Sequence, residues 1–248
     1  MIRQVNTLRR LAVLSFALAI ACGRARDGDA FLRDTSAAPR EASASAGDST
    51  HPALRAPRPA RQRVERILFV GTSLTAGMGL DPSEAYPAVV GRMLDSAGRA
   101  VEVVNAGVSG ETSAGALRRI DWVLRTPADV VVIETGANDG LRGLSVSAAR
   151  ANIASIIDRV RTKVPKARIL LVQMESPPNM GARYTSEFRA MFPELARAKS
   201  VELVPFLLEG VAGEAALNQD DGIHPNRAGA RIVARTMFDA IVALPPRG

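Results

Sequence analysis

The 248-residue chain has few of the side chains that form disulfides or bind metals, with one cysteine and two histidines. A single cysteine excludes any disulfide within the chain. The acidic residues show no EF-hand spacing, and Cys22 lies outside the part expected to fold, so we expect no metal site and no cofactor. The apolar run at residues 11–21 is too short to span a bilayer as a helix.

The excess positive charge belongs to the N-terminal part of the chain. The formal charge is +7, but residues 1–66 carry 12 Lys and Arg against 6 Asp and Glu, and the remaining residues carry 20 against 19. The part expected to fold therefore offers no electrostatic case for nucleic acid, and it contains no DNA- or RNA-binding motif. We expect no nucleic-acid partner.

The first 21 residues have the pattern of an export signal. Three arginines precede the apolar run, and small residues precede Cys22. This ending resembles the lipobox of bacterial lipoproteins, although Ala19 stands where leucine is usual. The resemblance implies a signal peptide at residues 1–21, lipidation of Cys22 and anchoring to a membrane of the periplasm or cell envelope. An ordinary secretory signal, cut nearby, is the alternative.

Residues 22–65 are rich in Ala, Arg, Pro and Ser and have no periodic apolar face. Such a segment buries too little surface to offset the entropy of ordering it. We therefore expect a disordered tether there, followed by a folded domain at residues 66–246.

Within that domain, short apolar segments alternate with amphipathic ones, which predicts a parallel sheet with helices on both faces. Strands are expected at residues 67–70, 101–104, 130–133, 169–172 and 201–204, and helices at residues 84–97, 112–125, 145–164, 187–198, 207–217 and 228–244. The segment 130–133 is the most apolar strand and is expected to be central. The pattern favours a flavodoxin-like three-layer α/β sandwich with five strands in the order 2-1-3-4-5.

A serine follows the first expected strand. Gly71 permits a tight turn, and Ser73 comes two residues after the strand, at the sheet edge where open α/β folds place their ligands. His224 is the only histidine in the expected domain, and Asp221 lies three residues before it. A carboxylate beside the imidazole would fix its tautomer, as in a Ser-His-Asp triad. The Asp-x-x-His spacing alone is weak evidence, since a His-Pro turn is commonly structural.

Two more glycine-containing loops follow strands. Gly110 offers a backbone N–H and Asn138 a side-chain amide, and together with the N–H of Ser73 they could surround the oxygen of a tetrahedral intermediate. Each loop by itself resembles an ordinary turn. Because all of them lie at or near the carboxyl ends of strands, their combination favours a site.

These segments resemble, in order, the four blocks of the SGNH (GDSL) hydrolases. The matching runs are Gly71-Thr-Ser73-Leu, Gly110 within Asn-Ala-Gly-Val-Ser-Gly, Gly136-Ala-Asn138-Asp and Asp221-Gly-Ile-His224. The longer runs at residues 136–143 and 219–226 are similar to the branch that contains bacterial periplasmic thioesterase/lysophospholipases and arylesterases. The resemblance covers residues 66–244.

The resemblance implies a serine hydrolase of small-molecule carboxylic esters or thioesters that forms an acyl-enzyme. It implies Ser73 as the nucleophile, Asp221 and His224 as its partners, and Ser73, Gly110 and Asn138 as the oxyanion hole. We expect the enzyme to be a monomer.

One residue departs from the family pattern, because Thr72 stands in place of the usual aspartate. That aspartate is not a triad member, so the chemistry should survive, and the Thr72 hydroxyl can hydrogen-bond locally. Glu134 at a strand end either orients a loop or faces solvent. Glu111, Asp139 and Asp220 flank the motif residues and are expected to be hydrogen-bonding residues of the loops rather than catalysts.

Other functions remain open from the sequence. A carbohydrate O-deacetylase could use the same chemistry, and a non-catalytic flavodoxin-like surface lipoprotein is a further alternative. A nucleotide-binding module is disfavoured, because residues 71–79 fit neither common phosphate-loop motif. Four apolar residues lie near the plausible acyl-binding surface, although core packing is the stronger expectation for Phe192: Met174, Pro177, Met180 and Phe192.

Overall fold

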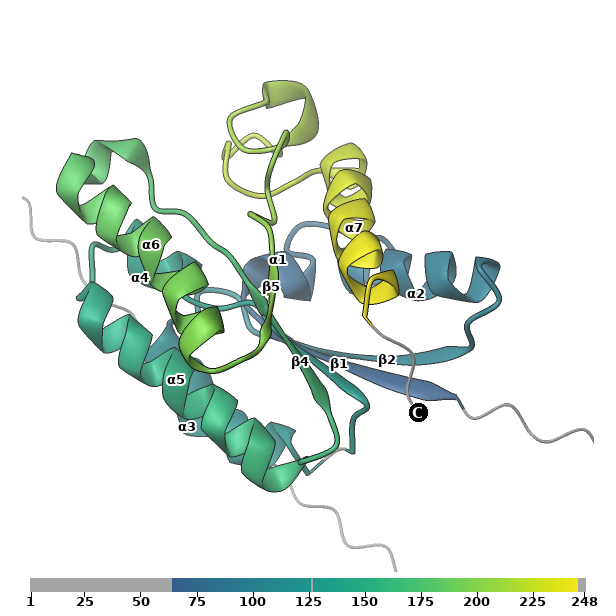
Figure 1. Cartoon of the computed structure of the whole chain (residues 1–248). Coiled ribbons are helices and arrows are strands. Elements are labelled where there is room, and N and C mark those ends of the chain that lie inside the picture. The colour runs from purple at the N-terminus through teal and green to yellow at the C-terminus, as the bar shows by residue number, and fades with distance from the viewer. Residues whose placement is uncertain (1–63, 126, 245–248) are drawn as a thin grey trace, which may run out of the picture. The chain divides into compact units, whose positions relative to one another are not determined.

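Five parallel strands form one sheet in the order β2-β1-β3-β4-β5 (Figure 1). The computed structural model describes residues 64–125 and 127–244. The strands are β1 (Glu65–Gly71), β2 (Val101–Gly107), β3 (Val130–Ile133), β4 (Arg168–Val172) and β5 (Glu202–Val204). The predicted strand order and α/β class are confirmed, and the most apolar segment is the central strand.

Helices cover both faces of the sheet, as expected for right-handed crossovers between parallel strands. They are α1 (Ser73–Ala76), α2 (Tyr86–Ser96), α3 (Ser113–Val123), α4 (Ala137–Leu141), α5 (Val146–Lys163), α6 (Ala182–Ala198) and α7 (Arg227–Val242), with 3₁₀ turns η1 (Pro178–Met180) and η2 (Ala215–Leu217). Figure 1 shows α3, α5 and α6 on one face and α2 and α7 on the other. Within the described part of the chain, no helix combines the length and apolarity needed to cross a membrane.

The core lies on either side of β3. All four residues of β3 are fully buried, because β1 and β4 flank the strand and helices cover its two faces. Each buried aliphatic side chain stabilises the fold by about 1.5–3 kcal/mol. The register pairs Val70 with Ile133 and Gly71 with Gly107, so the carboxyl ends of the first three strands meet at one edge of the sheet.

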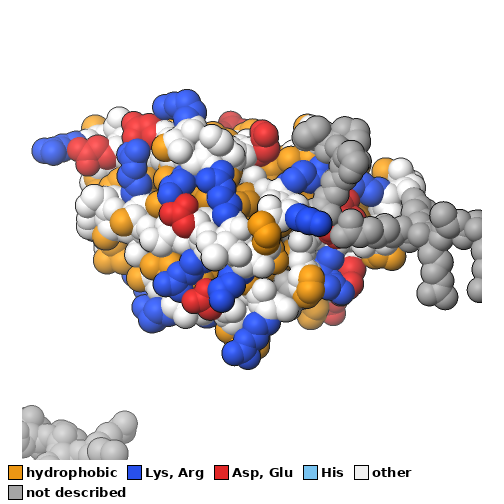
Figure 2. All heavy atoms as spheres, turned by 60° about the horizontal axis from the view of Figure 1, so that its bottom comes forward, with side chains coloured by type: hydrophobic (Ala, Val, Ile, Leu, Met, Phe, Trp, Pro, Cys, Tyr) orange, Lys and Arg blue, Asp and Glu red, His pale blue; other side chains and the backbone are white. Residues whose placement is uncertain are grey.

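The described surface carries both signs of charge. Figure 2 shows Lys and Arg side chains interspersed with Asp and Glu over the face that it presents. Some charged side chains of the described surface pair across helices, as in Arg159 with Asp121 and Lys199 with Asp158. This mixture agrees with the nearly balanced charge of the chain after residue 66.

Two expected helices differ from the structure. The helix expected at residues 207–217 is wrong, since only η2 forms there. Gly210 and Gly213 both have positive φ, at 70° and 81°, a conformation that ends a right-handed helix. Helix α6 starts at Ala182, five residues before the expected start, directly after the turn at Gly181.

The N-terminal predictions fall outside the described residues. These are the signal segment at residues 1–21, the lipidation site Cys22 and nearly all of the tether at residues 22–65. Strand β1 begins at Glu65, one residue before the expected start of the domain.

Candidate active site

Strand β1 carries Ser73 to the carboxyl edge of the sheet. The strand ends at Gly71, and Ser73 is the first residue of α1, with 9% of its surface exposed. A Cβ atom at Gly71 would lie 1.9 Å from Oγ1 of Thr75, so the turn has room only for glycine at this position. As the first residue of a helix, Ser73 has a backbone N–H without an acceptor in a preceding turn.

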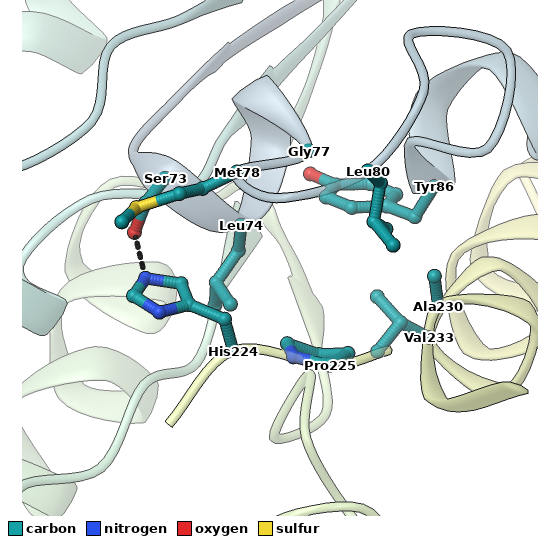
Figure 3. A pocket seen from close by; sticks show the side chains of 10 residues that line it. All are labelled: Ser73, Leu74, Gly77, Met78, Leu80, Tyr86, His224, Pro225, Ala230 and Val233. Atoms are coloured by element: carbon teal, nitrogen blue, oxygen red, sulfur yellow. Dashed lines mark hydrogen bonds between the residues drawn. The ribbon is translucent and has the colours of Figure 1, made fainter. Parts of the chain in front are cut away.

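The loop before α7, residues 218–226, brings His224 to Ser73. The Nε2 atom of His224 lies 2.8 Å from Oγ of Ser73 (Figure 3). Gln219 supports this approach, because its backbone N–H donates to the carbonyl of His224 and its side-chain amide donates to the carbonyl of Met78, each at 2.7 Å. One side chain thus ties the histidine loop to the segment that follows the serine.

Asp221 lies on the far side of the imidazole. Its Oδ2 is 2.6 Å from Nδ1 of His224, and its Oδ1 accepts the backbone N–H groups of His224 and Ile223 at 3.0 and 2.9 Å. The backbone N–H of His224, the imidazole and the N–H of Ile223 together lower the pKa of Asp221 from 3.8 to about 2. The ionised carboxylate accepts a hydrogen bond from Nδ1–H, which leaves the lone pair of Nε2 facing Ser73.

Gly110 and Asn138 lie at the same sheet edge. Gly110 has a φ of 76°, and its carbonyl accepts a hydrogen bond from Arg142 at 2.9 Å. The Nδ2 atom of Asn138 donates to the carbonyl of Glu111 at 3.0 Å. An amide NH₂ group has two hydrogens, so the second remains available to a ligand.

The serine–histidine pair and the two expected oxyanion donors, Gly110 and Asn138, line one cavity of about 780 Å³. Its polar wall includes Ser73, Gly110, Asn138 and His224, and its apolar wall includes Leu141, Met174, Pro177, Phe206, Leu208 and Ile223. Of the apolar residues expected near the site, Met174 and Pro177 line the cavity, Met180 does not, and Phe192 is fully buried in the core. In the part of the chain that the structure describes, no group of three or more His, Cys, Asp or Glu side chains is placed to hold a metal ion.

Thr72 bonds to a distant carboxylate, so the expectation of a local hydrogen bond is wrong. Its backbone N–H and hydroxyl both donate to Glu134, at 2.8 and 2.9 Å, and the hydroxyl of Thr75 donates to the same carboxylate at 2.8 Å. Glu134 is fully buried, which excludes the alternative that it faces solvent. Its carboxylate bonds to residues of the turn that carries Ser73.

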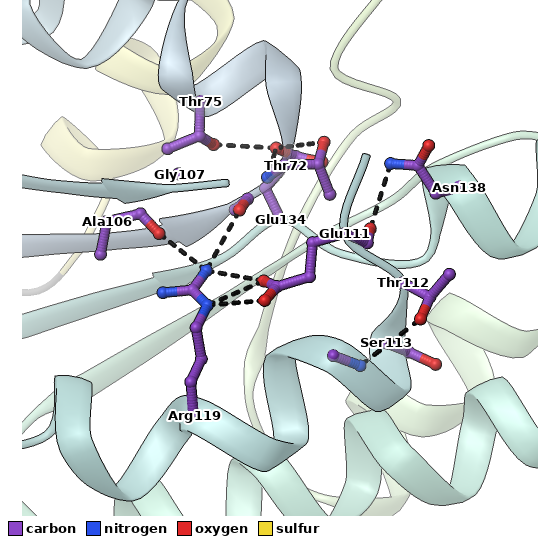
Figure 4. A network of polar contacts seen from close by, with 12 residues as sticks. Thr72, Thr75, Ala106, Gly107, Glu111, Thr112, Ser113, Arg119, Glu134 and Asn138 are labelled. Carbon is purple, nitrogen blue, oxygen red and sulfur yellow. Dashed lines mark hydrogen bonds and ion pairs between the residues drawn. The ribbon is translucent and has the colours of Figure 1, made fainter. Parts of the chain in front are cut away.

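A second polar cluster supports the loop that carries Gly110 (Figure 4). The guanidinium of Arg119 forms an ion pair with Glu111 at 2.7 Å and donates to the carbonyls of Ala106 at 2.8 Å and Gly71 at 3.4 Å. These contacts join α3 to the ends of β1 and β2. As expected, Glu111 serves as a hydrogen-bonding residue of its loop.

Asp139 joins the same loop to the segment that carries Asn138. Its carboxylate accepts the backbone N–H of Ser113 at 2.7 Å and the hydroxyl of Ser113 at 2.6 Å. The start of α3 and the start of α4 are therefore held together, which fixes Gly110 relative to Asn138. This bonding agrees with the expectation for Asp139.

Three supporting residues of the site were not singled out by the sequence analysis: Thr75, Arg119 and Gln219. Thr75 lies two residues after the serine in a motif that draws attention to the serine itself. Arg119 lies on an amphipathic helix, where an arginine usually indicates only a solvated face. Gln219 directly precedes the acidic loop, and its position in the longer motif was the available signal.

Known protein families and characterised proteins include relatives of this chain. Residues 69–232 match the model of the GDSL-like Lipase/Acylhydrolase family. The chain is 42% identical over 163 residues to esterase TesA of Pseudomonas aeruginosa, covering 65% of this chain and 80% of that protein. It is 37% identical over 174 residues to thioesterase 1/protease 1/lysophospholipase L1 of Escherichia coli, covering 70% of this chain and 81% of that protein.

Solved structures show the same architecture. The crystal structure of TesA superimposes with a TM-score of 0.68 at 38% identity, covering 71% of this chain and 98% of TesA. The SGNH-hydrolase family esterase AlinE4 superimposes with a TM-score of 0.62 at 41% identity, covering 75% of this chain and 100% of AlinE4. The resemblance found in the four sequence blocks is therefore confirmed, and the chain belongs to the GDSL-like lipase/acylhydrolase family, the SGNH hydrolases.

Proposed function

We propose that this chain is a serine esterase that hydrolyses carboxylic esters or thioesters through an acyl-enzyme on Ser73. One observation carries the proposal: Oγ of Ser73 lies 2.8 Å from Nε2 of His224, whose Nδ1 lies 2.6 Å from Asp221. A serine, an imidazole and a carboxylate in this order can activate the hydroxyl for attack on a carbonyl. All three groups come from one chain, so the triad needs no residue from a second copy.

The acylation step follows from these positions. His224 accepts the proton of Ser73 on Nε2 as Oγ attacks the acyl carbonyl, and Asp221 stabilises the imidazolium that forms. The N–H groups of Ser73 and Gly110 and the free amide hydrogen of Asn138 bind the oxyanion. Loss of one such donor typically lowers turnover by about 10²-fold or more. The intermediate then expels the alcohol or thiol, which takes the proton from His224.

Hydrolysis of the acyl-enzyme uses the same residues in reverse. A water molecule in the place of the leaving group gives its proton to Nε2 of His224 and attacks the acyl carbon. The oxyanion donors act a second time, and collapse of the second intermediate returns the proton to Ser73 and releases the acid. Apart from the substrate and this water, no group outside the chain is needed to balance either step.

The walls of the cavity favour an apolar acyl or aryl group. Apolar residues such as Met174, Phe206 and Leu208 line it, and they gain little from a hydroxyl-rich sugar. Relatives named esterase, arylesterase and thioesterase/lysophospholipase support the same class. A panel of p-nitrophenyl esters, acyl thioesters, lysophospholipids and acetylxylan tests this preference. Faster hydrolysis of acetylxylan than of every apolar ester would instead support the deacetylase.

Replacement of the nucleophile tests the proposal directly. Ser73→Ala should lower kcat for p-nitrophenyl butyrate by at least about 10³-fold, because no acyl-enzyme can form. Ser96→Ala, an exposed serine of α2, is the matched control and should retain full activity. A fluorophosphonate probe should label the wild type and the control but not Ser73→Ala. Unchanged turnover in folded, pure Ser73→Ala would reject the assignment.

We further propose that the protein is exported and anchored through a lipid on Cys22. The basic start, the apolar run at residues 11–21 and the small residues before Cys22 support this proposal. The anchor would hold the esterase at a membrane of the periplasm or cell envelope.

A further inference from the structure

The buried carboxylate of Glu134 has an unusual set of partners. Its side chain is completely buried, and within the described part of the chain its carboxylate accepts hydrogen bonds from Thr72 and Thr75, the residues on either side of the Ser73–Leu74 pair (Figure 4). No ion pair to Glu134 occurs among the described residues. Because burial dominates, the pKa of Glu134 is raised, and the hydrogen bonds from Thr72 and Thr75 oppose this shift.

Three donor groups hold the serine turn from both sides. Thr72 N–H and the Thr75 hydroxyl reach Oε2, and the Thr72 hydroxyl reaches Oε1. The Thr75 oxygen also lies 2.8 Å from the hydroxyl of Tyr86, which can donate to it, since Thr75 uses its own hydrogen on Glu134. A buried chain of hydrogen bonds therefore runs from α2 through the turn to the end of β3.

Close packing leaves the turn little freedom to move away from this carboxylate. A Cβ atom on Gly71 would lie 2.7 Å from Oε2 of Glu134 and 1.9 Å from the hydroxyl of Thr75. Thr72 does not cap α1 with its side chain, because its hydroxyl is used on Glu134. A second carboxylate at position 72 would repel Glu134 unless one of the two took a proton, whereas threonine supplies a hydrogen.

We propose that Glu134 is a positioning residue for the nucleophile: its carboxylate fixes Thr72 and Thr75 so that Oγ of Ser73 meets His224 and N–H of Ser73 faces the cavity. The inference rests on the proposed function. It assigns to Glu134 no contact with substrate. Its effect is on the geometry of attack, where a displacement of about 1 Å can lower the rate by about 10²-fold.

The competing explanation is that Glu134 only stabilises the fold. Asp129 provides a matched control, because it lies at the other end of β3, is 6% exposed, and accepts the backbone N–H of Arg66 in β1 at 2.8 Å. Both carboxylates flank the central strand. Asp129 accepts a backbone N–H of β1, and Glu134 accepts the backbone N–H of Thr72, the residue after β1. Only Glu134 contacts the serine turn.

The experiment compares Glu134→Ala, Glu134→Gln and Asp129→Ala by kcat, KM, the rate of fluorophosphonate labelling and Tm. Glu134→Ala should lower kcat and the labelling rate by about 10–100-fold with KM changed by less than about threefold. Glu134→Gln should recover kcat to within about fivefold of wild type, since its amide oxygen still accepts from Thr72 and Thr75 and its NH₂ can donate to the Thr72 oxygen. Asp129→Ala should lower Tm but leave kcat within about twofold.

Two results would overturn the inference. One is a kcat of folded Glu134→Ala within about twofold of wild type, and the other is an equal loss of kcat in Asp129→Ala. If Glu134→Ala does not fold, Thr75→Val removes one donor while filling its space and should lower kcat by about three- to tenfold, and an unchanged kcat would count against the role. Ser73→Ala, measured alongside, distinguishes a failure of the proposed function from a failure of the role assigned to Glu134. Activity that survives in Ser73→Ala rejects the proposed function, whereas an inactive Ser73→Ala beside a fully active Glu134→Ala rejects only the role of Glu134.

Discussion

Asp221 keeps its negative charge at a lower pH than an ordinary aspartate, because two backbone N–H groups and the imidazole of its own loop bind the carboxylate and lower its pKa. Its folded pKa, about 2, is lower than the ordinary value of 3.8, so the folded state binds fewer protons between these values. Asp221 therefore contributes stability above about pH 4, and this contribution is lost as the pH falls toward 2.

Comparison of wild type with Asp221→Asn across pH tests this linkage. The difference in urea midpoint should be constant from neutral pH down to about pH 4 and should shrink between 4 and 2. The same variant should lower kcat at neutral pH by about 10⁴-fold, because the amide cannot fix the tautomer of His224. A difference in midpoint that disappears well above pH 4, or one that persists unchanged at pH 2, would contradict the expected pKa.

Two features of the sequence identified the residues of the site: the small number of histidines and the position of a serine after a strand. His224 was the only histidine available to the expected domain, and Ser73 followed a strand, so their proximity could be predicted without coordinates. The partner of Thr72 could not, because Glu134 lies 62 residues away and is brought close only by the pairing of β1 with β3. Its burial was the missing fact, since a glutamate at a strand end is compatible with solvent or with a turn.

At the scale of helices and strands, apolar runs gave the most accurate predictions. β3 has the bounds expected from its apolar residues. The first three family blocks, which carry Ser73, Gly110 and Asn138, follow the ends of β1, β2 and β3. Strand β2 extends to Gly107, beyond the expected end at residue 104, because its backbone pairs with β1 as far as Gly71. Pairing with a neighbour, rather than side-chain pattern, set that boundary.

Arg119 connects three elements, and its removal should affect all of them. Arg119→Met would leave the carboxylate of Glu111, whose side chain is 10% exposed, without its cation. It would also remove the guanidinium donor from the carbonyl of Ala106, whereas the carbonyl of Gly71 would keep the N–H of Val108. We expect the free energy of unfolding to fall by about 2–4 kcal/mol, and kcat to fall with it as the Gly110 loop loses support.

The neighbouring residue provides the control for this element. Arg118 is exposed on the same helix, so Arg118→Met changes the same charge without touching the strand ends. Urea unfolding of both variants measures the difference. If the two variants were equally stable within about 0.5 kcal/mol, the ion pair would be a surface feature without a role in joining α3 to the sheet.

At the scale of the whole molecule, the proposed anchor and the esterase site should be separable. Cys22→Ser, expressed with its leader in a bacterial host, should fail to incorporate a labelled fatty acid and should leave the membrane fraction, while its esterase activity stays unchanged. Ser73→Ala should show the opposite result, with the label and the membrane location retained and the activity lost. Fatty-acid incorporation into Cys22→Ser would contradict lipidation at this cysteine.

Arg99 has a consequence for how this esterase can be attached to something else. Its guanidinium bonds Glu65 at the start of β1 and the carbonyl of Ile241 near the end of α7, at 2.7 and 3.1 Å. Ser73 and its cavity lie past the opposite end of β1, so the start of β1 and the last turn of α7 lie together at the end of β1 away from the cavity. A bead, a scaffold or a second enzyme could be joined at either terminus, or at both, and esters would still have open access to the serine.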